Sequence, residues 1–181
     1  MDLRPALQIQ TAIKAMTDVV LPAVDRENKM AQEQARLVIG MLHLALTRMP
    51  LAYRFERDEL SRFLALADTL QRRAAELPQG KEAVRDLSSV AEHGMNVLRR
   101  AGAEPSDLEV AVFGLREKIG EVVTTLSAQF PPAKLRPIYD AVTDHAHEQL
   151  LRERSWVIAQ GWEADPTAIP PIETLIGDKR P

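Results

Sequence analysis

The chain has 181 residues, of which 45% are hydrophobic and 27% charged, and its formal net charge is −3. This composition is typical of one soluble globular domain and excludes a largely disordered chain. The lack of a basic excess argues against a nucleic-acid partner. The lack of cysteine excludes disulfides, thiol nucleophiles and zinc–thiolate sites.

The first predicted helix spans residues 5–21. Pro5 suits its first turn, where the missing N–H costs no hydrogen bond, and Pro22 either ends or bends the helix. The chain start has no apolar core of signal-peptide length and no small-residue cleavage site, so we expect a cytoplasmic protein. The helix carries apolar residues at helical spacing, namely Ile9, Ile13, Met16 and Val20.

The second predicted helix, residues 29–49, contains the most apolar stretch of the chain. Residues 37–46 are apolar on nearly every side, with Gly40 and His43 as the exceptions. A helix with one dry face would show a stripe rather than a band. The stretch is also too short to cross a bilayer, which needs about 20 residues. We therefore expect this helix to be the most buried one, in a bundle or at a subunit interface, and we expect no membrane partner.

Two further helices are predicted over residues 57–77 and 81–101, with Pro78 and Gly80 between them. Gly102 is expected to end the second of these in a left-handed conformation. The first of them has a regular apolar face, which consists of Leu60, Phe63, Leu64, Ala67, Leu70 and Ala74.

The fifth helix is predicted to begin at Ser106, because Ser106 and Glu109 have the spacing of a capping box. The sixth begins near Pro132 and runs to about residue 160, with Gly161 as its stop. The apolar face of the fifth helix consists of Leu108, Ala111, Leu115, Ile119, Val122 and Leu126.

These elements predict an all-α fold, because no segment shows the alternation of a strand. We expect an antiparallel bundle of five to six helices over residues 1–161, followed by an irregular C-terminal arm over residues 162–181. The arm contains four prolines but also apolar residues, so we expect it to dock on the bundle or on a partner subunit. Those apolar residues are Ile169, Ile172, Leu175 and Ile176.

Four residues are candidates for lining a ligand pocket. His43 lies inside the apolar band, where a histidine either hydrogen-bonds within the core or an interface, or contacts a ligand at the bottom of a cavity. His145, Gln149 and Arg152 follow one another along the sixth helix near the edge of its apolar face. Such a polar seam either orients an acidic ligand or marks a boundary between two helices.

The densest group of potential metal ligands or acid–base groups is Asp144, His147 and Glu148, which share a face of the sixth helix. A metal site of the ferritin-like kind needs Glu-x-x-His motifs on two helices, and this chain has none. The sequence also has no phosphate-binding glycine loop and no nucleophile elbow, so we expect no cofactor and assign no catalytic residue.

Three functions remain open. The first, which we favour, is a non-catalytic protein that acts by self-association, as a homodimer, or by binding a protein partner, since it requires the fewest special residues. The second is a small-molecule-binding bundle with an interhelical pocket at the four candidate residues. The third is a metal-dependent or acid–base enzyme that uses Asp144, His147 and Glu148.

Overall fold

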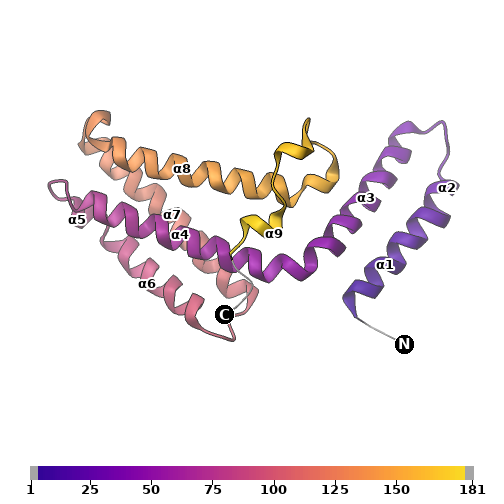
Figure 1. The fold of residues 1–181 in the computed structure, drawn as a ribbon, viewed down its shortest axis with the longest axis horizontal. Coiled ribbons are helices and arrows are strands. Elements are labelled where there is room, and N and C mark those ends of the chain that lie inside the picture. Colours follow the sequence, from indigo (N-terminus) through magenta and orange to yellow (C-terminus); the bar gives the residue numbers. More distant parts are fainter. Residues whose placement is uncertain (1–3, 178–181) are drawn as a thin grey trace. The chain divides into compact units, whose positions relative to one another are not determined.

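The computed structural model describes residues 4–177, and all regular structure in this range is helical (Figure 1). The prediction of an all-α fold is therefore confirmed. The described residues form two compact units. Unit 1 contains residues 4–52 and 152–175, and unit 2 contains residues 53–151 together with 176 and 177. The division into a bundle over residues 1–161 and an arm over residues 162–181 stays a prediction.

Unit 1 begins with a helical stretch that passes through Pro22. Helix α1 (Pro5–Ala15) continues into a π-helical segment, Met16–Val20, and then into α2 (Leu21–Ala23). Proline lacks an N–H and crowds the carbonyl one turn before it. Because a π-helical insertion rearranges that turn, the helix continues past Pro22 instead of ending there.

Helix α3 (Lys29–Arg48) runs beside α1 in unit 1 (Figure 1). Asn28 caps its first turn by accepting a hydrogen bond from the Ala31 N–H at 3.0 Å. The prediction that this helix is the most buried one is wrong, since its only buried residues are Gln32 and Ala35. The apolar band is present, but none of its residues is fully buried in the described chain, and Leu37, Val38 and Met41 are exposed.

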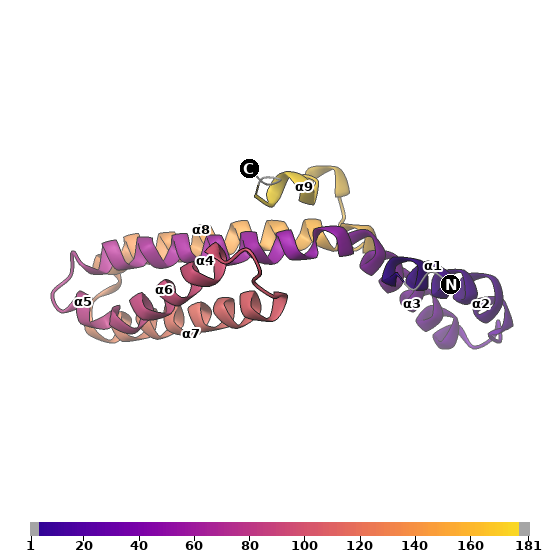
Figure 2. The same cartoon turned by 90° about the horizontal axis from the view of Figure 1, so that it is seen from below.

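Unit 2 contains α4 (Ala52–Ala74), α5 (Gly80–Ala83), α6 (Arg85–Arg99), α7 (Pro105–Gln129) and most of α8 (Pro132–Trp156). Figure 2 shows α4 and α8 alongside each other, with α6 and α7 beneath them. The apolar faces predicted for α4 and α7 are entirely buried and form most of one hydrophobic core. Gly94 on α6 permits close packing, since a Cβ there would lie 3.3 Å from the side chain of Leu64.

Two predicted helix ends of unit 2 are placed differently in the structure. Helix α7 begins at Pro105, and its capping box pairs Glu104 with Asp107 rather than Ser106 with Glu109. Proline is favoured at the first helical position, which fixes the start one residue earlier. Gly102 does not have the positive φ that was predicted for the end of this helix. Instead, a turn in which the Ala103 N–H donates to the Arg100 carbonyl follows α6.

The chain after α8 contributes to unit 1. Short 3₁₀ turns at Ile158–Gln160 and Pro166–Ala168 precede α9 (Ile172–Leu175). The prediction that the sixth helix runs to about residue 160 with Gly161 as its stop is wrong, since α8 ends at Trp156 and Gly161, with a φ of 74°, ends the first 3₁₀ turn instead. Ile169 and Ile172 are buried, and Ser155 Oγ donates to the Pro170 carbonyl at 2.7 Å. The described chain itself buries these two residues, so their burial does not require the arm to dock on a partner subunit.

Candidate interaction surfaces

The four candidate pocket residues are divided between the two units. His43 is exposed on α3, so it is not the core histidine that the apolar band suggested. Arg152 is buried and belongs to unit 1, whereas His145 and Gln149 are half-buried in unit 2. The two depressions described below and at the α1–α3 hairpin, near Leu87 and near Gln32, are lined by none of the four.

His145 and Gln149 lie at a helix–helix boundary of unit 2. The His145 ring packs on Phe63 of α4, with the ring centroids 4.5 Å apart. Gln149 Nε2 donates to Glu59 Oε1 at 3.0 Å, and Arg116 of α7 donates to the same oxygen at 2.5 Å. One carboxylate of α4 therefore binds both neighbouring helices, which corresponds to the helix-boundary interpretation of the seam.

The proposed acid–base group does not assemble. Asp144, His147 and Glu148 are all exposed, and Glu148 accepts a hydrogen bond from Arg62 at 2.7 Å. Among residues 4–177, no three side chains of His, Cys, Asp or Glu converge in a way that could hold a metal ion.

Glu56 on α4 is a carboxylate in an unfavourable position. Its Oε2 is buried and has no hydrogen-bond partner in the described chain. Desolvation by burial raises its pKa above the usual 4.5, and the nearby carboxylates of Glu109 and Glu59 raise it further. Glu56 lies one helical turn before Leu60, on the apolar side of α4. The carboxyl group of Glu56 is therefore in surroundings that disfavour its ionised form.

The most unusual surface of unit 1 is the outward side of α3. Large apolar side chains lie there in the open: Met30 is 75% exposed and Met41 64%, and Leu37 and Val38 are also exposed. We call these four residues the α3 face. Residues at these spacings lie on one side of a helix, where the exposed Gln34 separates Met30 from the other three. Scattered apolar residues are normal on a surface, but several large ones on one side of a helix indicate a contact surface.

Unit 1 has little interior of its own at this hairpin. None of the residues in α1 is buried, and one of the two buried residues in α3 is polar. That residue, Gln32, donates from Nε2 to the Val24 carbonyl at 2.8 Å and accepts from Arg36 at 3.2 Å. The interface between α1 and α3 is therefore shallow, and it leaves the α3 face uncovered.

The far end of α3 is fixed by Arg48, which is mostly buried. Its Nε donates to the Trp156 carbonyl at 2.8 Å and its Nη2 to the Ser155 carbonyl at 3.1 Å. Its guanidinium lies 5.6 Å from the centre of the Trp156 ring, and Glu173 of α9 is 3.9 Å away. A cation is favoured at the last carbonyls of a helix, so Arg48 holds the end of α8 and the following segment in unit 1.

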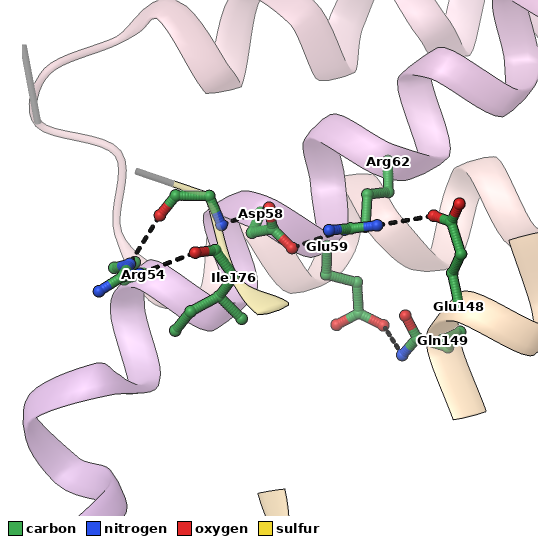
Figure 3. A network of polar contacts seen from close by, with 8 residues as sticks. Arg54, Asp58, Glu59, Arg62, Glu148, Gln149 and Ile176 are labelled. Atoms are coloured by element: carbon green, nitrogen blue, oxygen red, sulfur yellow. Dashed lines mark hydrogen bonds and ion pairs between the residues drawn. The ribbon is translucent and has the colours of Figure 1, made fainter. Parts of the chain in front are cut away.

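A second contact surface lies on α4 in unit 2, where Ile176 and Gly177 are held (Figure 3). Arg54 donates from Nε to the Gly177 carbonyl and from Nη2 to the Ile176 carbonyl, each at 2.7 Å. The Gly177 N–H donates to Asp58 Oδ1 at 2.8 Å. We call Arg54 and Asp58 the α4 clamp. The sequence analysis missed it, because backbone groups provide its partners and these carry no sequence signature.

One helical stretch in the described part of the chain, Lys29–Ala74, is long and apolar enough to cross a membrane by length and composition. Only 6% of its most apolar window is buried. Helices of soluble proteins pass the same length and hydropathy test, usually because they are buried in a core. The low burial singles out α3 once more as an apolar helix that lacks a cover.

Comparison of the chain with protein-family models, with curated proteins and with solved structures finds no match.

Proposed function

We propose that this protein is a non-catalytic interaction protein that forms a homodimer through the α3 face. The observation that carries the proposal is the exposure of Met30, Leu37, Val38 and Met41 on a helix with almost no buried residues. The proposal includes the finer fold prediction of an antiparallel bundle of five to six helices. It also includes a cytoplasmic location, without nucleic acid, membrane or cofactor.

A second copy is a suitable cover for this face. Two helices bury only one shallow layer between them, whereas two such hairpins packed together enclose a four-helix core. A two-fold interface uses the same patch on both copies, so one apolar stripe supplies both sides. Met30 and Met41 are flexible and adapt to an opposing apolar surface.

The length of the apolar band favours a second copy over a bilayer. Residues 37–46 form a helical segment about 15 Å long at 1.5 Å per residue, and the hydrocarbon core of a bilayer is about 30 Å thick. Arg36 and Arg48 flank the band. A membrane-spanning position would place at least one of these guanidiniums in hydrocarbon, at a cost of several kcal/mol.

The test is sedimentation velocity of the full chain over a hundredfold range of concentration. Wild type is expected to be a dimer, and Met41→Glu a monomer with an unchanged far-UV circular dichroism spectrum. Val110 on α7 is a matched control, because it is 65% exposed but lies in unit 2. Val110→Glu is expected to stay dimeric. A monomeric wild type, or a dimeric Met41→Glu, contradicts the proposal.

A small-molecule site is the second candidate, because unit 2 contains a depression of about 830 Å³. Ligand pockets commonly have volumes of about 300–1,000 Å³. Buried Leu87 and Val122 contribute apolar surface, and Lys81 and Asp86 contribute charges. Gln79, which also lines it, has a φ of 60°, an uncommon conformation outside glycine. Native mass spectrometry of the freshly purified protein tests this candidate: a retained small molecule supports it, and the bare mass opposes it.

A further inference from the structure

The α4 clamp recognises the backbone of a peptide segment. Three backbone groups of Ile176 and Gly177 are hydrogen-bonded by two side chains, Arg54 and Asp58 (Figure 3). The planar guanidinium of Arg54 spans two successive carbonyls with two N–H groups held in a fixed fork, which the point charge of a lysine does not offer. Charge-assisted bonds of this kind are short and strong.

The side chains of the segment are selected as well. Ile176 is only 3% exposed, so the segment is held with its aliphatic side chain buried. A Cβ at position 177 would lie 2.9 Å from Asp58 Oδ1, closer than such contacts occur. The segment held by the clamp is thus an aliphatic residue followed by glycine, and a larger residue at position 177 requires the Asp58 carboxylate to shift.

The clamp does not depend on the segment that it holds. Asp58 Oδ2 accepts from Arg62 Nε at 2.7 Å, and Arg62 Nη1 reaches Glu148 of α8 at 2.7 Å (Figure 3). This chain of ion pairs fixes the Asp58 carboxylate, whose side chain is only 10% exposed. Ile176 is buried but is not part of the hydrophobic core cluster of unit 2. Release of the segment therefore leaves the core and a formed site in place.

We propose that the α4 clamp is a peptide-docking site that binds the Ile176–Gly177 segment of a second copy in exchange for its own. The residues before this segment, 152–175, belong to unit 1, whereas Ile176 and Gly177 belong to unit 2 together with the clamp. Exchange of an identical element between two copies needs no new contact. The clamp and the α3 face are separate surfaces in different units. A chain with both an intact clamp and an intact segment keeps its own segment bound at high effective concentration. Met41→Glu alone is therefore expected to stay monomeric over the range of the sedimentation test, and the two proposals stand or fall separately.

The decisive experiment is complementation between two full-length variants, both carrying Met41→Glu to remove the α3 face. One also carries Gly177→Val, which leaves an open clamp but no segment that fits it. The other also carries Arg54→Ala, which leaves a usable segment but a damaged clamp. Native mass spectrometry is expected to show a 1:1 complex in the mixture and monomers in each protein alone. A mixture that contains only monomers overturns the proposal.

A control mixture shows that the complex uses the segment. Adding Ile176→Asp to the Arg54→Ala protein disables its segment as well, and the complex is then expected to disappear. A complex that persists is held elsewhere and contradicts the proposal. If the Gly177→Val protein is unfolded by circular dichroism, Ile176→Asp takes its place as the variant without a usable segment.

Binding of a labelled peptide measures whether the α4 clamp is free to bind a segment, and it does so independently of the oligomeric state of the protein. The probe is residues 166–177 with an amidated end and a fluorescent label, measured by anisotropy. In the wild-type chain, the protein's own Ile176–Gly177 segment competes with the peptide at high effective concentration. We expect the full-length Gly177→Val protein to bind the peptide at least tenfold more tightly than wild type, and Arg54→Ala added to it to abolish binding. Equal affinity for the two chains, or binding that survives Arg54→Ala, overturns the proposal, even if Met41→Glu abolishes dimerisation.

Discussion

Replacing Arg48 by alanine is expected to destabilise unit 1 and leave unit 2 unchanged. The substitution removes the two hydrogen bonds to the carbonyls of Ser155 and Trp156. Bonds from a charged donor contribute about 1.5–3 kcal/mol each, so we expect a loss of about 3 kcal/mol from the free energy of unfolding of unit 1. With a urea m-value of about 2 kcal/mol/M, the midpoint of that transition falls by about 1.5 M.

The distribution of tryptophan makes this measurable. The chain has two tryptophans, Trp156 and Trp162, and both belong to unit 1. Tryptophan fluorescence therefore reports unit 1, whereas far-UV circular dichroism reports the helices of both units. Arg72→Ala is the control, because Arg72 and Asp68 form an exposed ion pair in unit 2 and such pairs contribute little. An unchanged fluorescence midpoint in Arg48→Ala would refute the role given to this residue.

Two further predictions concern unit 2. Gly80→Ala places a Cβ 1.8 Å from the Ala74 carbonyl oxygen and is expected to lower the free energy of unfolding, by about 1–3 kcal/mol as in other overpacked sites. Gly120→Ala in α7 meets no atom within 4 Å and is expected to stabilise by about 0.5–1 kcal/mol through helix propensity; urea denaturation followed by circular dichroism compares the two, and equal effects would contradict the packing at Gly80. Because the pKa of Glu56 is raised on folding, its protonation stabilises the fold fully below pH 4.5, and this contribution is lost as the pH rises through the folded pKa. Glu56→Gln is therefore expected to be more stable than wild type at pH 7. Its free energy of unfolding is also expected to rise less than that of wild type as the pH falls from 7 to 4.5. An unaltered pH profile would contradict the burial of Glu56.

The helices of unit 2 are largely predictable from the sequence. A single apolar stripe at a spacing of three and four residues identifies both the helix and its buried side, as for Leu60 and Leu64 on α4 or Leu115 and Ile119 on α7. The residues at which these helices begin are less predictable. For α7, Pro105 and Ser106 each provide a valid start signal, and the helix begins at Pro105 because proline is favoured at the first helical position.

The placement of α3 could not be predicted by the same argument. An all-round apolar band indicates that a helix needs cover on several sides, but it does not indicate which chain provides that cover. His43 was taken for a core residue for this reason and is exposed. The α4 clamp could not be predicted from the sequence either, since Arg54 and Asp58 bind the main chain of residues that are far away in the sequence.

The central claim, that a second copy covers the α3 face, is tested most directly by thiol reactivity. The native chain has no cysteine, so Met41→Cys and Val110→Cys each introduce a single thiol at positions of nearly equal exposure, 64% and 65%. The rate of reaction with a water-soluble maleimide is measured for both proteins from nanomolar to high micromolar concentration. The account predicts that the thiol at position 41 becomes protected as the concentration rises, while the thiol at position 110 reacts equally fast throughout. Equal and constant rates at the two positions would contradict it.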